Sequence, residues 1–269
     1  MKVELIAEND LRRSEFIYSF LNDKKISSVV IELPSLPKTI VRYWHNLKDI
    51  PNDVVECMDS WEPLQDQGFQ FKLFDDNSAQ LFILEHLDKD HLKAYLNCHH
   101  PAMRCDYFRL CYLYIFGGFY VDCDEYLLDE NMNILFSNND LKLQPLCYSI
   151  KLNKMVEIES YTKEPYDASK IYYFNNNPII SPPQHILINI ALKRATEKLL
   201  TEIDLSDIQS ITGPGNLSAS LVYYLMNGNN EIDVIQNWNS ISETRWPLSY
   251  RSDDRNWRIY DSVSKKWFE

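Results

Sequence analysis

Three acidic residues lie within four positions of one another, directly after a hydrophobic run. They are Asp122, Asp124 and Glu125 of the stretch GGFYVDCDEY. Carboxylates at alternate positions past a strand can converge on a hard divalent cation such as Mg²⁺ or Mn²⁺, with coordination sites left for water and phosphate oxygens. A solvated acidic turn explains the same spacing about equally well. The spacing by itself therefore leaves a metal site and an acidic turn open.

A second charged pair lies just upstream, in an otherwise apolar run. Asp106 and Arg109 are three positions apart, so they share one face of the helix predicted there. A local ion pair explains them without any chemistry, and exposed pairs of this kind contribute little to stability. Their position immediately before the acidic stretch makes a joint site with Asp122 and Asp124 the preferred interpretation.

The elements that must position these residues alternate between helix and strand. Apolar spacing and end signals predict helices over 8–25, 54–64, 76–98 (one or two helices), 101–116, 182–203 and 213–227. β-rich runs predict strands over 26–33, 38–44, 68–74, 118–124, 170–176 and 178–180. Strands separated by helices predict an α/β fold with a mostly parallel central sheet flanked by helices. Ligands of such folds usually bind at the carboxyl ends of the strands.

Composition limits the partners and the compartment. A formal net charge of −12 over 269 residues argues against nucleic acid, whose phosphates demand clustered Lys and Arg. The longest apolar run, 107–121, is interrupted by Arg109 and two glycines and falls short of the roughly 20 residues that a membrane helix needs. We expect no transmembrane segment and no signal peptide. Six cysteines without a CxxC pair indicate a reducing compartment, so we expect a protein of the cytoplasm or of the inner face of the membrane.

The stretch HHPAMRCDYFRLCYLYIFGGFYVDCDEYLL resembles the core of glycosyltransferase family 32, whose sugar-binding region contains a DXD motif. It is also similar, more distantly, to the bacterial glucosylating toxins. Two further segments are similar to the family: LPKTIVRYWHN, in which Val41 replaces the usual His, and ITGPGNL from Ile211. The resemblance covers roughly residues 36–228. The matching residues of the core are Ala102, Asp106, Arg109, Gly117, Gly118, Tyr120, Asp122 and Asp124.

The resemblance implies a GT-A-type nucleotide-binding fold and a metal-dependent transfer from a nucleotide sugar that retains the anomeric configuration. It implies that Asp124 coordinates Mn²⁺ or Mg²⁺ directly, and that Asp122 contacts the ribose or the shell of the metal. Asp106 and Arg109 would hold sugar hydroxyls and the adjacent phosphate, with Trp44 near the base. The implied catalytic residues are Asp106, Arg109, Asp122 and Asp124. The implied donor-binding residues are Trp44, Asp106, Arg109, Tyr120, Asp122 and Gly213.

We expect one domain over 1–269, with a nucleotide-sugar core over about 36–228 and a C-terminal region, 229–269, that completes the site. Members of this class often supply a further metal ligand near the C-terminus, but the chain has no His after His185. The residues left open for that role are Asp253, Asp254, Asp261 and Glu243.

The leading functional hypothesis is a retaining transfer from a nucleoside-diphosphate sugar, a UDP-hexose first, to a hydroxyl of a surface-polysaccharide glycan. A protein acceptor, as in the toxins, is second. The alternatives are a metal-dependent phosphohydrolase or nucleotidyltransferase that uses the same carboxylates, and an inactive sugar- or nucleotide-binding module.

Several residues near the motif receive smaller expectations. The adjacent histidines His99 and His100 are interpreted as structural, because neighbouring side chains point apart. The amides of 175–177 could bind sugar hydroxyls or form a turn. We expect Glu125→Gln to be mild, because its side chain points away from that of Asp124. We also expect Asp106→Asn and Arg109→Ala to leave the fold intact and lower turnover.

Overall fold

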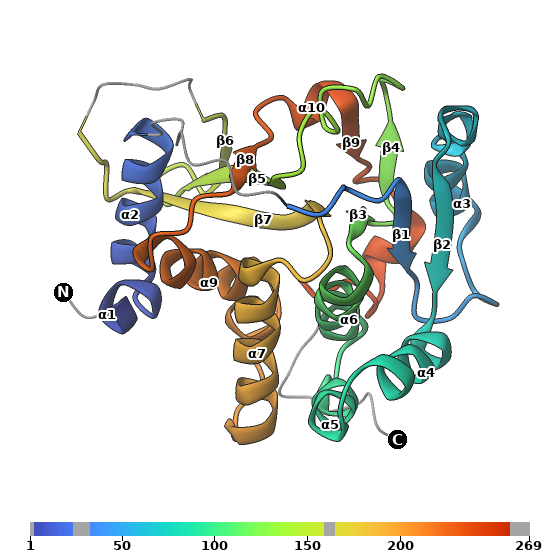
Figure 1. Ribbon diagram of the computed structural model, residues 1–269, viewed down its shortest axis with the longest axis horizontal. Coiled ribbons are helices and arrows are strands. Elements are labelled where there is room, and N and C mark those ends of the chain that lie inside the picture. Colours follow the sequence, from blue (N-terminus) through green and yellow to red (C-terminus); the bar gives the residue numbers. More distant parts are fainter. Residues whose placement is uncertain (1–2, 24–32, 159–164, 259–269) are drawn as a thin grey trace.

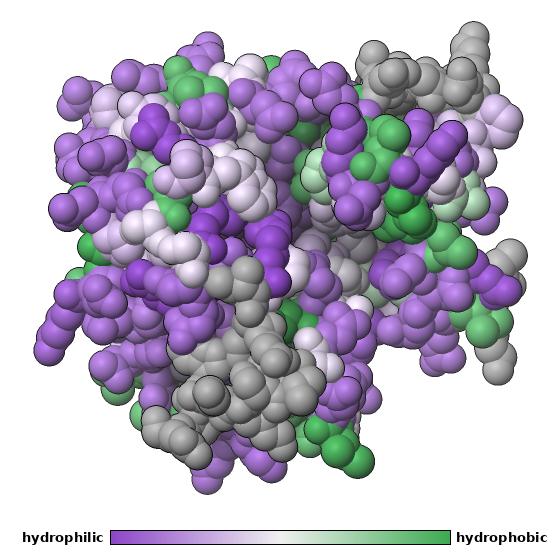
Figure 2. Space-filling model, turned by 180° about the vertical axis from the view of Figure 1, so that it is seen from behind, coloured by the Kyte–Doolittle hydropathy of each residue, from purple (hydrophilic) through white to green (hydrophobic). Residues whose placement is uncertain are grey.

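The computed structural model of the chain describes residues 3–23, 33–158 and 165–258 (Figure 1). Almost all of the strand expected over 26–33 lies outside the described residues, as does Asp261. None of the described helices is both long enough and apolar enough to cross a membrane. The face seen in Figure 2 is largely hydrophilic, with its hydrophobic residues in small separate groups.

A seven-stranded sheet forms the centre of the described structure, in the order β2, β1, β3, β7, β5, β6, with β8 also paired to β5. Five of the seven strands point in one direction, and only β6 and β7 run against them. The predicted α/β fold with a mostly parallel sheet is therefore confirmed. The strands are β1 (Thr39–Tyr43), β2 (Gln70–Phe74), β3 (Gly118–Tyr120), β5 (Leu141–Ser149), β6 (Lys154–Val156), β7 (Lys170–Ser181) and β8 (Ile232–Val234).

Helices cover both faces of the sheet, and Figure 1 shows α6, α7 and α9 together on one side of it. Neighbouring residues of β3 enter different cores, because strand side chains alternate between the faces. Tyr120 packs with α6 and α7, whereas Phe119 packs with Trp61 and Trp238 on the other face. The helices are α1 (Val3–Ala7), α2 (Asp10–Asp23), α3 (Asn52–Asp59), α4 (Asp76–His86), α5 (Lys89–Asn97), α6 (Pro101–Phe116), α7 (Ile186–Thr201), α8 (Ile208–Ile211), α9 (Pro214–Met226) and α10 (Trp238–Ile241), with 3₁₀ helices η1 (Glu62–Gln67) and η2 (Ser249–Ser252).

Helix α6, which carries Asp106 and Arg109, has the bounds that the sequence predicts. It begins with Pro101, and the Nδ1 atom of His100 accepts a hydrogen bond from the backbone N–H of Ala102 at 3.0 Å. It ends at Gly117, whose φ of 65° favours glycine. A Cβ atom on Gly117 would lie only 2.7 Å from the carbonyl oxygen of Ser181. The glycine therefore lets α6 turn tightly into β3 against the end of β7.

Strand β7 contains a bulge at the edge of the site. The sequence predicted two strands here, but one strand runs through both segments. Leu143 of β5 pairs with Ile179, whereas Pro145 pairs with Phe174, so four residues of β7 stand opposite Gln144 alone. Such a bulge breaks the ladder and redirects side chains. It places the amide of Asn176 beside Asp106 of α6 and the amide of Asn177 beside the backbone of Asp122.

The C-terminal part of the described chain returns to the acidic stretch. Strand β4 (Glu125–Leu127), which begins directly after Asp124, pairs antiparallel with β9 (Ser242–Thr244). The sequence predicted neither strand. This two-stranded sheet brings η2 and its neighbours next to the residues that follow β3.

Candidate active site

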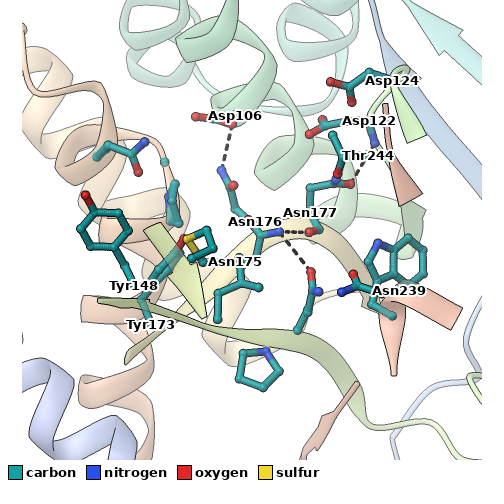
Figure 3. A pocket seen from close by; sticks show the side chains of 18 of the residues that line it. Asp106, Asp122, Asp124, Tyr148, Tyr173, Asn175, Asn176, Asn177, Asn239 and Thr244 are labelled. Carbon is teal, nitrogen blue, oxygen red and sulfur yellow. Dashed lines mark hydrogen bonds between the residues drawn. The ribbon is translucent and has the colours of Figure 1, made fainter. Parts of the chain in front are cut away.

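A cavity of about 1480 Å³ opens where β3 ends, beside the bulge of β7. Its lining includes five of the six expected donor-binding residues, and Asp124 as well. In Figure 3, Asp106, Asp122 and Asp124 lie on one side, Tyr148 and Tyr173 on another, and the amides of 175–177 between them. The predicted residues in the lining are Trp44, Asp106, Arg109, Asp122, Asp124 and Gly213.

Arg109 joins the two carboxylate groups predicted to form one site. Its Nη2 atom lies 3.0 Å from Oδ1 of Asp106 and 3.0 Å from Oδ1 of Asp122. Its Nη1 donates to the carbonyl oxygen of Asn176, and its guanidinium lies 4.3 Å from the centre of the Tyr120 ring. The side chain is almost wholly buried. The local ion pair of Arg109 with Asp106 is therefore present, but it is buried and includes Asp122 as well.

Asp106 is held from two sides within the cavity wall. Besides Arg109, the amide Nδ2 of Asn176 donates to its Oδ1 at 2.9 Å. Burial raises the pKa of Asp106 to about 6, and the positive charge of Arg109 opposes that rise. Its carboxylate is thus buried in the cavity wall and held by two neighbouring side chains.

Asp122 is the more accessible member of the DXD pair. About a third of its side chain is exposed (32%). Its backbone N–H donates to Oδ1 of Asn177 at 2.9 Å, so the bulge of β7 fixes the backbone of the motif. One oxygen faces Arg109, and the carboxylate as a whole borders the cavity.

Asp124 is bound by two residues that the sequence did not identify. Its Oδ2 accepts a hydrogen bond from the hydroxyl of Tyr250 at 2.7 Å and another from Nη2 of Arg251. Burial and the neighbouring charge of Asp122 raise the pKa of Asp124, and Arg251 counteracts them. Only the cluster of arginines within 245–258 could have indicated a cationic partner from this part of the chain.

Glu125 lies under the site, and the expectation that its replacement has only a mild effect on transfer stays a prediction. The side chain does point away from Asp124, but it enters the protein and is only 1% exposed. Its Oε1 accepts from Asn177 (3.0 Å) and Thr244 (2.6 Å), and its Oε2 accepts from Ser242 (2.6 Å) and Trp238 (3.3 Å). Burial raises its pKa to about 7. Glu125 therefore joins β4, β7, β9 and α10 under the site.

The other three expected donor-binding residues differ in their access to the cavity. Trp44 borders it and meets Tyr250 edge to face, at 5.2 Å between ring centres. Gly213 also borders it, where a Cβ would lie 3.1 Å from Cα of Gln209, so close packing of α8 explains the glycine. Tyr120 has no exposed surface and lies behind Arg109. It can therefore influence a ligand only through that side chain.

Of the residues left open as a third metal ligand, the structure describes three, and these do not join the DXD pair. Asp253 is held by Arg255 at 2.7 Å, and Glu243 is half-exposed beside Arg245. The backbone oxygen of Asp254 lies 3.2 Å from Nε2 of His100, a contact that supports the structural interpretation of this histidine. Within 3–23, 33–158 and 165–258, no three His, Cys, Asp or Glu side chains form a cluster that could hold a metal.

The DXD pair nevertheless fits a divalent cation that is shared with a phosphate. Mg²⁺ is usually bound by one or two carboxylates together with waters and substrate phosphates. Asp122 and Asp124 both border the cavity and supply the hard oxygen ligands that such a cation prefers. The carboxylate of Asp124 is engaged by Arg251, so a cation there would have to replace that contact.

Residues 51–141 match the family model described as "Glycosyltransferase sugar-binding region containing DXD motif". This span includes Asp106, Arg109, Asp122 and Asp124, so the predicted resemblance to this family is confirmed; the segments around Trp44 and Ile211 lie outside it. Among solved structures, the chain is similar to one titled "PaToxG Glycosyltransferase", with 12% identity and a TM-score of 0.46 over 95% of each chain. No curated protein matches the chain.

Proposed function

We propose that the chain is a retaining glycosyltransferase that moves a sugar from a nucleoside-diphosphate sugar, a UDP-hexose first, to a hydroxyl acceptor. One observation carries the proposal: the charged residues of the matched DXD region meet at one end of a single cavity. Arg109 holds Asp106 and Asp122 at 3.0 Å each, and Asp124 follows two residues later. This convergence favours a joint site over an acidic turn.

The roles proposed for the residues follow from their positions. Asp122 and Asp124 would hold Mn²⁺ or Mg²⁺, which supplies Lewis-acid stabilisation of a leaving diphosphate. Asp106 accepts hydrogen bonds and the amide of Asn176 both donates and accepts, so the two can orient sugar hydroxyls. Arg109 fixes Asp106 relative to Asp122 and thereby fixes the sugar relative to the phosphate.

Retention of the anomeric configuration rests on the family resemblance and on the engagement of the nearest candidate base. Asp106 is the carboxylate that we place beside the donor sugar, and with its Oδ1 held by Arg109 and Asn176 we assign it to binding that sugar. An inverting reaction would need a carboxylate that is free to take the proton of the acceptor. NMR of the new linkage tests this point, and an inverted anomer would refute the retaining mechanism.

The acceptor that we propose first is a glycan of a surface polysaccharide, and a protein side chain is second. Tyr148 and Tyr173 border the cavity across from the carboxylates (Figure 3). Aromatic rings offer apolar faces beside polar hydroxyls, a combination that suits sugar rings. We propose that transfer takes place in the cytoplasm or at the inner face of the membrane.

A metal-dependent phosphohydrolase or nucleotidyltransferase remains the alternative. Two-metal chemistry needs carboxylates around ions about 3.5–4 Å apart. Among the residues that the structure describes, Glu125 does not contribute to such a set, because its two oxygens face four hydrogen-bond donors of the protein. The transferase is therefore the better supported function.

Incubation with a panel of nucleotide sugars and Mn²⁺, followed by mass analysis, tests the proposal. Release of a nucleoside diphosphate with a free or transferred sugar supports the transferase, a nucleoside monophosphate with a sugar phosphate supports the hydrolase, and binding without products supports an inactive module. Asp124→Asn should lose nearly all transfer and Asp122→Asn most of it. Asp129→Asn is the matched control, because Asp129 is exposed in the loop that follows. Full activity of Asp124→Asn would show that the acidic stretch is only a turn.

A further inference from the structure

Arg251 occupies the carboxylate oxygen of Asp124 that faces the C-terminal segment. The two side chains form an ion pair, and each is only 12% exposed. Tyr250 donates to the same oxygen at 2.7 Å. One positive charge of the protein thus stands where the proposed cation would bind.

The guanidinium of Arg251 also has donor capacity that the protein does not use. Its Nε is buried and has no hydrogen-bond partner among the described residues. Its planar group lies 4.3 Å from the ring centre of Trp246, which is 56% exposed, and 5.3 Å from that of Tyr250. An arginine that borders a cavity with an unused donor matches the fork geometry that recognises phosphate.

The backbone of Arg251 is fixed, whereas the guanidinium lies at the end of a long side chain. Ser249 donates to the carboxylate of Asp53 through both its N–H (2.5 Å) and its hydroxyl (3.0 Å). The amide of Asn256 donates to the carbonyl oxygen of Arg251 at 2.8 Å. A change of rotamer can therefore move the charge across the cavity mouth without moving η2.

We propose that Arg251 is a diphosphate-binding residue that is held on Asp124 while the donor site is empty and moves to the phosphates when a divalent cation takes Asp124. The inference rests on the proposed function. Its physical basis is charge balance, because a cation at Asp124 repels the guanidinium and the phosphates that arrive with it attract the guanidinium. Arg109 cannot take this role without leaving Asp106 and Asp122, and Arg255 is paired with Asp253. Arg258 also borders the cavity, but it lies against the ring of Trp246, whereas Arg251 is the arginine paired with Asp124.

The proposal predicts effects of opposite sign in two calorimetric titrations of Arg251→Gln. Mn²⁺ alone should bind more tightly than to the wild type, by about 5-fold, because the competing cation is gone. UDP titrated in the presence of saturating Mn²⁺ should bind more weakly, by roughly 10–100-fold, because a charge-assisted phosphate contact is lost. Arg251→Lys keeps the charge without the fork, so it should weaken UDP binding and leave the affinity for Mn²⁺ near that of the wild type.

Arg245→Gln is the matched control, since it removes the same charge from the same segment. The Arg245 side chain contacts the Tyr126 ring at 3.6 Å and does not border the cavity. The affinities of Arg245→Gln for Mn²⁺ and for UDP should both stay within about 2-fold of the wild type, as expected for a screened surface charge. Circular dichroism tests whether each variant is folded. If Arg251→Gln does not fold, the affinity of Arg251→Lys for UDP decides whether Arg251 binds the diphosphate.

The outcomes separate this inference from the proposed function. If Arg251→Gln binds both Mn²⁺ and UDP more weakly, or binds both as the wild type does, Arg251 is a structural residue and the inference is overturned. The donor assay on the wild type still tests the transferase in that case. Pyrophosphate serves as a second probe, and it should show the same loss as UDP. A wild type that binds neither UDP nor pyrophosphate with Mn²⁺ would overturn the inference and the proposed donor together.

Discussion

Replacement of Glu125 by Gln should destabilise the protein strongly, although it removes only one charge. The two carboxylate oxygens each receive one hydroxyl and one N–H group: Thr244 with Asn177, and Ser242 with Trp238. Whichever way a Gln amide is turned, its NH₂ group faces a hydroxyl, which can accept, and an N–H group, which cannot. One buried donor is then left without an acceptor.

The expected loss at pH 8 is about 2–4 kcal/mol of unfolding free energy, since an unsatisfied buried donor costs about 1–3 kcal/mol and the other contacts lose their charge assistance. The loss should grow at lower pH. The folded pKa of Glu125 is about 7 and lies above the unfolded value of 4.5, so proton binding favours the folded wild type increasingly as pH falls from 7 toward 4.5. With about 1.36 kcal/mol per unit, the wild type gains roughly 2–3 kcal/mol over the variant between pH 8 and pH 5.

Urea unfolding followed by circular dichroism at pH 8 and pH 5 measures both effects. Glu243→Gln is the matched control, because Glu243 lies on β9 of the same small sheet and is exposed. That variant should stay within about 0.5 kcal/mol of the wild type at both pH values. A midpoint for Glu125→Gln equal to that of the wild type, or a larger loss at pH 8 than at pH 5, would refute the hydrogen-bond account.

Four further substitutions test the supports of the site. Arg109→Ala should cost about 3–5 kcal/mol in urea unfolding, because it leaves two carboxylates without their buried partner, whereas Asp106→Asn should cost less and lower turnover. The pKa of His100 is lowered by burial to about 4. The stability that its neutral imidazole contributes to the fold is therefore present above the unfolded pKa of 6.5 and is lost as pH falls toward 4. The stability difference between the wild type and His100→Gln should therefore shrink by up to about 3 kcal/mol over that window. Gly117→Ala should cost more than about 2 kcal/mol, because its Cβ would lie 2.6 Å from the backbone N of Pro183 at a positive φ, and unchanged thermal unfolding would contradict that geometry.

The helices were the most predictable part of the fold, because their signals are local. The 101–116 helix carries its own start and stop, a Pro in the first turn and a Gly after the last. The break within 76–98 falls at Leu87, where Asp88 begins the next helix by accepting hydrogen bonds from the N–H groups of Asp90 and His91. The positions at which these helices begin and end therefore depend on contacts between residues two to four positions apart.

Strand β5 was not predicted, because it lacks the pattern of an independent strand. Its sequence LKLQPLCYS contains a Pro and a buried Lys. Pro145 is tolerated because it lies next to the register shift, where the ladder with β7 is already interrupted. Lys142 lies 3.7 Å from Asp233 of β8, which is far along the chain. The surroundings that permit both residues exist only after the sheet is assembled.

The site shows the same division between local and distant signals. Asp106, Arg109, Asp122 and Asp124 could be grouped from the sequence because one helix carries the first two and the short strand that follows it leads directly to the other two. Tyr250 and Arg251 stand 126 and 127 positions from Asp124. No local spacing connects them with the motif; the pairing of β4 with β9 and the hydrogen bond from the N–H of Arg245 to the carbonyl oxygen of Asp124 bring the two segments together.

The charges at this end of the cavity show how far Arg109, which is close in sequence, and Arg251, which is distant, balance the carboxylates. Asp106, Asp122 and Asp124 bring three carboxylates together, while Arg109 and Arg251 supply two positive charges. Burial raises the pKa values of Asp106 and Asp124, and the negative charge of Asp122 raises both further. A site with surplus negative charge attracts a cation and opposes an anion that arrives alone. The anionic donor of the proposed reaction should therefore depend on a divalent cation for its affinity, because without one it would meet carboxylates that the two arginines leave incompletely neutralised.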